Sequence, residues 1–296
     1  MNLLETPLCE LLGVELPIVQ APMANNAPPA LAAAVSAAGA LGSLAGATIS
    51  AGELRAEIHE VRDATDRPFA VNLFAPPYLH DENLEVVLEE RPAVCSIAFG
   101  IADPAPLRDA GIVVLGTATT AGEARALEQA GVDAVVAQGA EAGGHRGSFL
   151  DGFPLVPLAE LVPACVDAVS VPVVAAGGIM DGAGIAEMLR LGAAGASLGT
   201  AFLFTPEAGR PREHLEALRT LETVVTDAYT GRPMRAARTP VLEELMAGPP
   251  PLPFPEQRKV SAEQGPLFMG GTGATRARAL GAGELIGLLV AEAERA

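Results

Sequence analysis

The residues best suited to chemistry lie between Gln138 and Gly147, in the stretch Gln-Gly-Ala-Glu-Ala-Gly-Gly-His-Arg-Gly. The four glycines in this stretch let the backbone come close to a flat or charged ligand, because glycine has no side chain to block the approach. The histidine, His145, can take up or release a proton near neutral pH. The stretch directly follows an apolar run at residues 133–137 that is typical of a buried strand. We therefore expect a cofactor site in which His145 acts as a general base.

Two further glycine stretches follow later apolar runs. They are Ala-Ala-Gly-Gly-Ile at residues 175–179 and Ser-Leu-Gly-Thr at residues 197–200. Gly178 and Gly199 would expose backbone N–H groups to an anion, and Thr200 would add a hydroxyl. The same glycines could instead only tighten two strand-to-helix turns. Their position after the seventh and eighth predicted strands favours a phosphate site, because barrels commonly bind phosphate with these two loops.

Strand-like and helix-like patterns alternate along residues 17–198. Short apolar runs predict eight strands, at residues 17–21, 41–45, 69–73, 94–98, 112–116, 133–137, 171–175 and 194–198. Helices are predicted between them at residues 28–38, 51–64, 81–90, 104–110, 120–130, 157–168 and 182–191. This order favours an α/β fold of the (β/α)8 TIM-barrel type, although the pattern alone also permits an open doubly wound sheet. In a barrel, all three glycine stretches would lie at the C-terminal ends of strands, where active sites are built.

The pattern changes after residue 198. Residues 212–228 predict a helix, and residues 229–264 are rich in Pro and Arg, with Pro-Pro-Pro-Leu-Pro at 249–253. We interpret residues 229–270 as a Pro/Arg-rich, lid-like excursion over the barrel mouth, and residues 283–295 as a helix that closes the outer ring. The whole chain, residues 1–296, is therefore expected to form a single barrel domain.

Composition limits the classes of protein to which the chain can belong. Half of the 296 residues are apolar, which is enough for a large core. The net charge of −17 argues against nucleic acid or an anionic membrane surface as a partner. An anionic cofactor must then be held by local donors. The three cysteines form no CxxC pair, and neither a signal peptide nor a membrane span is evident, so we expect a cytoplasmic protein.

Other chemistries receive less support from the sequence. The site histidine has no ligand partner at metal-binding spacing, so no metal is expected. A Schiff-base mechanism is disfavoured because the single lysine, Lys259, lies in the Pro-rich excursion. Arg146 is a candidate for contact with an anionic substrate or a carboxylate. The other arginines near the mouth, Arg232, Arg235 and Arg238, are expected on an ordinary solvated face.

Several motifs occur together in a characteristic order: residues 17–24 (Pro-Ile-Val-Gln-Ala-Pro-Met-Ala), 71–72 (Val-Asn), 99–100 (Phe-Gly), 138–147, 175–181 and 199–202 (Gly-Thr-Ala-Phe). In combination they resemble the nitronate monooxygenase family, formerly called 2-nitropropane dioxygenases, whose members are FMN-dependent TIM-barrel enzymes. The resemblance covers roughly residues 8–240. It implies that the FMN phosphate lies on Gly178 and on Ser197, Leu198, Gly199 and Thr200. It also implies that Met23, Asn72, Gln138 and Gly143 contact the isoalloxazine ring or the ribityl chain, and that His145 is the catalytic base.

The resemblance implies oxidation of small nitroalkanes or nitronates by O2, with release of nitrite and a carbonyl product. The expected partners are a small-molecule substrate and O2, and a homodimer is considered as the assembly. Two alternatives stay open: an FMN-dependent NAD(P)H enoyl-thioester reductase, and a non-catalytic flavin-binding or partner-docking barrel. The sequence departs from the family at Asn25 and Asn26, where glycine is usual, and at residues 270–273, where a glutamine is missing.

Overall fold

Eight parallel strands form the centre of the computed structural model, which describes residues 3–150 and 152–296. Their bounds are β1 Ile18–Gln20, β2 Gly42–Leu44, β3 Phe69–Phe74, β4 Val94–Ala98, β5 Val113–Ala118, β6 Ala134–Gln138, β8 Val173–Ala176 and β9 Gly195–Leu198. They follow the order β1-β9-β8-β6-β5-β4-β3-β2. Val19 of β1 also pairs with Leu41, which directly precedes β2, so the two edges of the sheet meet. The predicted (β/α)8 barrel is confirmed, and the open sheet is not what forms.

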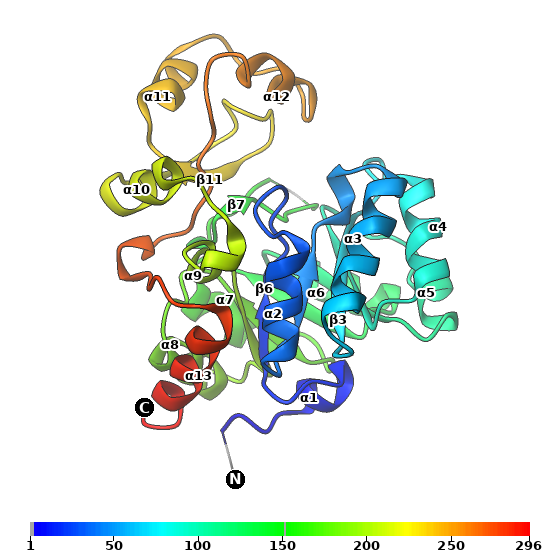
Figure 1. Cartoon of the computed structure of the whole chain (residues 1–296). Coiled ribbons are helices and arrows are strands. Elements are labelled where there is room, and N and C mark those ends of the chain that lie inside the picture. The colour runs from blue at the N-terminus through cyan, green and yellow to red at the C-terminus, as the bar shows by residue number, and fades with distance from the viewer. Residues whose placement is uncertain (1–2, 151) are drawn as a thin grey trace.

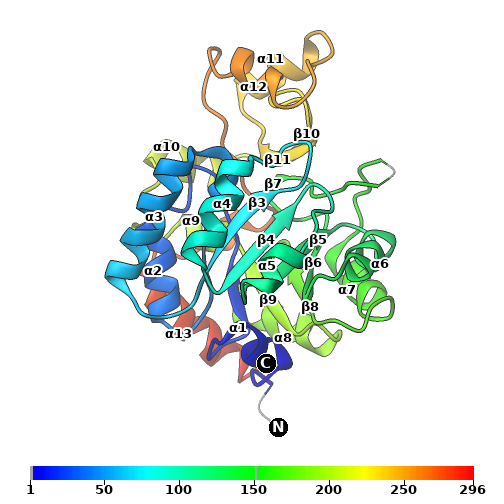
Figure 2. The ribbon, with the colours of Figure 1, turned by 90° about the vertical axis from the view of Figure 1, so that its right-hand side faces the viewer.

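Helices cover the outside of this barrel (Figures 1 and 2). Their bounds are α1 Pro7–Leu12, α2 Pro29–Ala37, α3 Ala51–Ala64, α4 Asp81–Glu90, α5 Ala105–Asp109, α6 Ala121–Ala130, α7 Leu158–Val166, α8 Gly182–Arg190 and α13 Ala282–Ala293. Local signals explain several of their ends: Thr120 and Asp181 accept backbone N–H bonds at the starts of α6 and α8, and Gly131 ends α6 in a left-handed conformation. Leu285 and Leu289 of α13 share an apolar cluster with α2 and α8, so α13 closes the outer ring as predicted.

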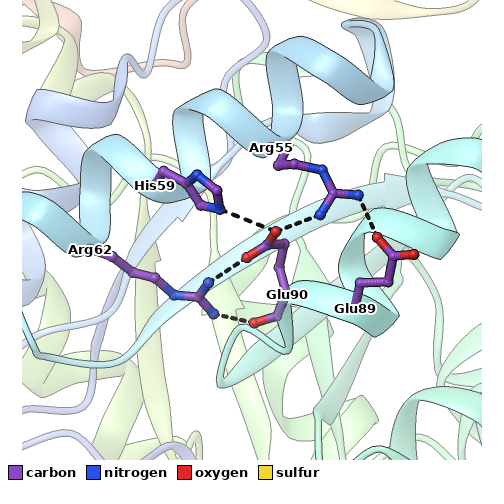
Figure 3. A network of polar contacts seen from close by, with 5 residues as sticks. All are labelled: Arg55, His59, Arg62, Glu89 and Glu90. Atoms are coloured by element: carbon purple, nitrogen blue, oxygen red, sulfur yellow. Dashed lines mark hydrogen bonds and ion pairs between the residues drawn. The ribbon is translucent and has the colours of Figure 1, made fainter.

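A polar clamp joins helices α3 and α4 (Figure 3). Glu90 accepts hydrogen bonds from Arg55 and Arg62, each at 2.6 Å, and lies 3.1 Å from Nε2 of His59. Arg55 also contacts Glu89. Partial burial would raise the pKa of Glu90, but the hydrogen bonds from Arg55, His59 and Arg62 outweigh it and lower that pKa below 4.5. The clamp therefore fixes these two outer helices to each other.

The chain after β9 departs from the prediction. Short helices α9 Thr200–Leu203 and α10 Arg212–Thr220 come first, followed by strands β10 Thr223–Thr226 and β11 Met234–Ala237. The predicted helix at residues 212–228 is therefore wrong beyond Thr220. The β-branched run Thr-Val-Val-Thr pairs antiparallel with β11 instead of continuing the helix. On its other side, β11 pairs with β7, Gly144–His145, so this small sheet includes the site histidine.

Residues 229–270 form a folded unit above the C-terminal ends of the strands (Figures 1 and 2). This segment contains β11 and helices α11 Pro240–Ala247 and α12 Glu256–Ser261. It has an apolar cluster of its own around Tyr229, Met234 and Leu242. The Tyr229 hydroxyl donates to the carbonyl oxygen of Gly265 at 2.5 Å and ties its two ends together. The segment lies where a lid would lie, and its action as a lid stays a prediction. No helix in the described part of the chain is long and apolar enough to cross a membrane.

Candidate active site

His145 lies in the loop after β6, at the C-terminal end of the barrel. Its Nε2 is 3.1 Å from the hydroxyl oxygen of Thr230, a residue of the 229–270 segment. The aromatic rings of Phe99 and Phe254 meet the imidazole edge-on, with ring centroids 5.8 and 5.3 Å away. The histidine thus lies in a half-buried aromatic pocket to which two distant parts of the chain contribute.

The pKa of His145 is far below the ordinary value that the sequence suggests. An ordinary histidine has a pKa near 6.5, but desolvation, together with the positive charges of Arg232 and Arg258, lowers the pKa of His145 to about 3. The imidazole is therefore neutral at pH 7. A neutral imidazole has a free lone pair that can accept a proton. So low a pKa makes it a weak base, and the negative charge that develops on a bound substrate would raise the pKa towards the operating pH.

The side chain of Gln138 fixes the loop that carries His145. Its Nε2 donates to the carbonyl oxygen of His145 at 3.0 Å, and its Oε1 accepts from the N–H of Gly147 at 2.8 Å. Both ends of the amide are therefore used to hold the two sides of the histidine in place. This observation shows how Gln138 acts within the loop, and its expected contact with a flavin stays a prediction.

Three arginines hold the same loop through its carbonyl oxygens. Arg146 donates to Gly139 at 2.6 Å and Gln138 at 3.0 Å, and Arg235 donates to Ala140 at 2.7 Å. Arg232 donates to the carbonyl oxygens of Arg146 and Ser148. None of the three arginines forms an ion pair among the described residues. The three are thus positive charges gathered around the loop of a strongly acidic chain.

Two sequence-based interpretations of these arginines need correction. Arg232 is only 8% exposed and lies 4.1 Å over the ring of Phe99, so it is not on a solvated face. Arg146 is fully buried, and it binds neither a carboxylate nor the open site but backbone carbonyls. Burial lowers the pKa of Arg146 to about 10, with a further contribution from Arg235, and the side chain remains a cation at pH 7. Both arginines therefore support the site by binding the backbone of the His145 loop.

A buried carboxylate anchors the far end of the loop. Glu123 of α6 is 1% exposed and accepts from the N–H groups of Phe149 and Leu150 at 2.6 and 3.1 Å. It also accepts from the N–H and hydroxyl of Thr119. This role could not be predicted from the sequence, because a glutamate in the first turn of a helix is ordinarily a helix-stabilising charge.

The glycine stretches after β8 and β9 provide free backbone donors. Gly178 takes a left-handed conformation with φ of 68°, which strongly favours glycine. Among the described residues, the N–H groups of Gly178 and Gly199 have no hydrogen-bond partner. The Thr200 hydroxyl accepts from the N–H of Gly271 at 2.8 Å and keeps its own hydrogen to donate. Partly buried donors without partners at strand ends are what a phosphate group would satisfy.

The segment at residues 270–273 links these stretches. A methyl group added at Gly178 would lie 2.9 Å from Cβ of Glu141 and 3.2 Å from Oγ1 of Thr272. One added at Gly143 would lie 2.5 Å from the backbone of Gly270. Both glycines are therefore required by the packing of the chain itself, whether or not a ligand is bound. The glycines at residues 270–273 fit this close packing, because this segment meets the loops of Gly143 and Gly178 where a side chain would not fit.

The remaining predicted cofactor residues have separate neighbours. Met23 lies beside Gly199, since a methyl group added at Gly199 would be 3.5 Å from the sulfur of Met23. Asn72 lies within β3, two residues before its end at Phe74. Its amide donates to the carbonyl oxygen and hydroxyl of Ser96 at 3.0 and 3.1 Å. Ser197 and Leu198 are buried residues of β9 itself.

The two asparagines that replace the usual glycines have a structural explanation. Asn25 adopts φ of 58°, and asparagine is among the few residues that tolerate this left-handed conformation. Arg210 donates to the carbonyl oxygen of Asn25 at 2.6 Å and to the side-chain oxygen of Asn26 at 2.7 Å. The turn after β1 is therefore held from outside by Arg210. In the described residues, no group of three or more His, Cys, Asp or Glu side chains could hold a metal ion.

A neutral histidine, free backbone donors and glycine-rich loops at the C-terminal end of a (β/α)8 barrel define a cofactor-dependent barrel enzyme. The chain matches the family model for nitronate monooxygenase over residues 5–83 and 77–292, and it belongs to this family. The predicted family is thereby confirmed, as is the predicted class of enzyme, an oxidoreductase.

Known proteins agree with this assignment. A probable nitronate monooxygenase of Staphylococcus aureus (strain JH9) is 38% identical over 282 residues, which cover 80% of this chain and 79% of the relative. The structure of a nitroalkane oxidase from Streptomyces ansochromogenes is 38% identical, with a TM-score of 0.90, and the match covers 97% of this chain and 98% of that one. FabK from Thermotoga maritima is 32% identical, with a TM-score of 0.85 and coverage of 98% and 96%.

Proposed function

We propose that the protein uses FMN and O2 to oxidise small nitroalkanes or their nitronates, releasing nitrite and a carbonyl compound. The observation that carries the proposal is a neutral imidazole, His145, placed between aromatic rings beside loops with free backbone donors. When bound, FMN would supply the redox chemistry, and the residues of this chain would bind, orient and deprotonate the substrate.

His145 is the proposed base for a neutral nitroalkane. The α-proton would pass to the imidazole, and the electron pair of the broken C–H bond would stay on the substrate as a nitronate anion. The guanidinium of Arg232 is a nearby positive charge, as its effect on the pKa of His145 shows, and it would stabilise that anion. Phe99 and Phe254 would keep water away from the reacting carbon.

The proposed FMN contacts follow the free donors. The phosphate would bind the backbone of Gly178 and the stretch of Ser197, Leu198, Gly199 and Thr200. The isoalloxazine ring and ribityl chain would contact Met23, Asn72, Gln138 and Gly143. Because the chain carries a net charge of −17, the dianionic phosphate needs such local donors to overcome long-range repulsion.

A comparison of FMN with riboflavin tests the phosphate site. Riboflavin lacks only the phosphate, and two charge-assisted hydrogen bonds contribute roughly 1.5–3 kcal/mol each. We expect riboflavin to bind at least about 100-fold more weakly than FMN in a fluorescence titration, since ~3 kcal/mol is about two factors of ten. Equal affinities would place the phosphate elsewhere, and no binding of either would remove the basis of the proposal.

Anaerobic mixing separates the enzymatic alternatives. The similarity to FabK is the observation that keeps the reductase alternative in view. We expect flavin absorbance to bleach with nitronate and to stay unchanged with NADPH. Bleaching by NADPH alone would favour the reductase, and no bleaching by either would favour the non-catalytic barrel.

A further inference from the structure

The hydroxyl group of Thr230 links His145 to the C-terminal segment. Thr230 is fully buried, and its Oγ1 lies 3.1 Å from Nε2 of His145. The same oxygen donates to the carbonyl oxygen of Arg232 at 2.9 Å. A threonine hydroxyl has one hydrogen, and here that hydrogen is given to the carbonyl. The bond to His145 must then run the other way, with Nε2 as the donor.

The reverse arrangement is disfavoured by hydrogen-bond satisfaction. If Thr230 donated to Nε2, the carbonyl oxygen of Arg232 would lose its partner among the described residues. Arg232 is buried, and a buried carbonyl without a partner is costly. With Nε2 as the donor, the imidazole, the hydroxyl and the carbonyl are all satisfied at once.

The position of Thr230 relative to His145 is fixed on both sides. The Arg232 side chain donates to the carbonyl oxygens of Arg146 and Ser148, which belong to the loop of the histidine. The N–H of Arg146 donates to the carbonyl oxygen of Pro233 at 2.8 Å. The turn that carries Thr230 and the loop that carries His145 are therefore bound to each other at several points.

We infer that Thr230 is a positioning residue that holds the neutral His145 imidazole with its hydrogen on Nε2, so that Nδ1 is the atom that accepts the substrate proton. Nδ1 has no hydrogen-bond partner among the described residues. The tautomer assignment rests on the hydrogen bonds alone, and the role of Nδ1 in proton transfer rests also on the proposed function. In that step the C–H bond of the substrate breaks, an Nδ1–H bond forms, and the electron pair remains on the nitronate.

Nitrogen NMR of histidine-labelled protein, as purified, tests the tautomer directly. A neutral imidazole shows one protonated and one unprotonated nitrogen, and the couplings to the ring protons identify which is which. We expect the wild type to show hydrogen on Nε2 of His145, Thr230→Val to show a mixture of tautomers, and Thr230→Ser to restore the wild-type pattern. Hydrogen on Nδ1 in the wild type would overturn the inference, and this result needs no variant and no activity.

Kinetics test the consequence for proton transfer. Thr230→Val should lower kcat/KM for a neutral nitroalkane roughly 3- to 10-fold, the equivalent of one net hydrogen bond, and leave preformed nitronate nearly unaffected. Thr230→Ser should restore most of the loss. Thr220→Val is the matched control, because Thr220 is exposed and, within residues 3–150 and 152–296, its hydroxyl binds only the carbonyl oxygen of Glu216 in α10. Equal losses on both substrates, or no rescue by serine, would reduce Thr230 to a packing role. If the wild type oxidises neither substrate, the proposed function fails, and the NMR result still decides the tautomer.

Discussion

The lowered pKa of His145 predicts a specific dependence of stability on pH. In the unfolded chain this histidine would titrate near 6.5, whereas in the fold desolvation, Arg232 and Arg258 lower its pKa to about 3. Between these two values the unfolded chain binds a proton that the folded protein does not bind. The free energy of unfolding must therefore fall as the pH falls from about 6.5 towards 3. Above pH 6.5 this histidine should contribute no pH dependence.

The size of the effect follows from the two pKa values. Each pKa unit corresponds to about 1.4 kcal/mol, and pH 5 is about 1.5 units below the pKa of this histidine in the unfolded chain. The resulting loss between pH 7 and pH 5 is at most about 2 kcal/mol. His145 is only half-buried, and water will reduce the effect, so we expect a loss of roughly 1–2 kcal/mol.

Urea unfolding of flavin-free wild type and His145→Asn at pH 5, 6, 7 and 8 measures this loss. Asparagine has a polar side chain that does not titrate, so the difference between the two curves isolates the histidine. We expect the variant to gain relative to the wild type by roughly 1–2 kcal/mol as the pH falls from 7 to 5. Because the chain has four histidines, NMR can follow each ring directly. A constant difference across pH, or a ring signal of His145 that titrates near 6.5, would refute the reasoning.

Three further predictions concern the base, the cofactor loop and the outer clamp. His145→Asn should lower kcat/KM for a neutral nitroalkane about 10²- to 10⁴-fold and spare preformed nitronate; equal losses would mean that the histidine binds the nitro group. Gly178→Ala and Gly209→Ala both place a side chain at left-handed φ, which should cost about 1–2 kcal/mol in thermal unfolding at Gly209 and more at Gly178, where the new methyl group would lie 2.9 Å from Cβ of Glu141. An alanine at Gly209 meets no atom within 4 Å, so only Gly178→Ala should also weaken FMN binding, by about tenfold or more for one lost charge-assisted bond. Glu90→Gln should cost about 1 kcal/mol in urea at pH 7. Because the folded pKa of Glu90 is lowered, this cost should shrink only below pH 4.5, and its persistence under acid would argue against the ionic clamp.

The barrel could be predicted because its signals are local. Each strand is a short apolar run between glycine, proline or a helix cap, and the observed strands begin and end within two residues of the predicted bounds. The small sheet could not be predicted in the same way. Its strand β7 is two residues long, Gly144–His145, and shows no alternation of polar and apolar residues. The edge strand β10, which pairs with β11, follows α10 so closely that the apolar pattern continues across Leu221 into Val224.

The site was only partly visible in the sequence for a related reason. His145 was found because it follows a strand and stands in a glycine-rich stretch. Thr230 and Phe254, by contrast, lie more than 80 residues further along the chain, and no spacing rule connects them to the histidine. The lowered pKa of His145 could not be predicted for the same reason, since a pKa near 6.5 assumes solvent around the ring, and the fold supplies aromatic rings, Arg232 and Arg258 instead.

Three arginines gather positive charge around the His145 loop of a chain whose net charge is −17. Arg146, Arg232 and Arg235 donate to carbonyl oxygens, so their charge is oriented but not cancelled by a carboxylate. Desolvation first, and then the charges of Arg232 and Arg258, lower the pKa of His145, and the same charge of Arg232 would favour an anionic substrate nearby. The same arginine side chains therefore hold the His145 loop in place and supply its positive charge. A neutral replacement such as Arg232→Gln would change both together, and for that reason the roles of His145 and Thr230 are better separated by Asn, Val and Ser replacements that leave the arginines in place.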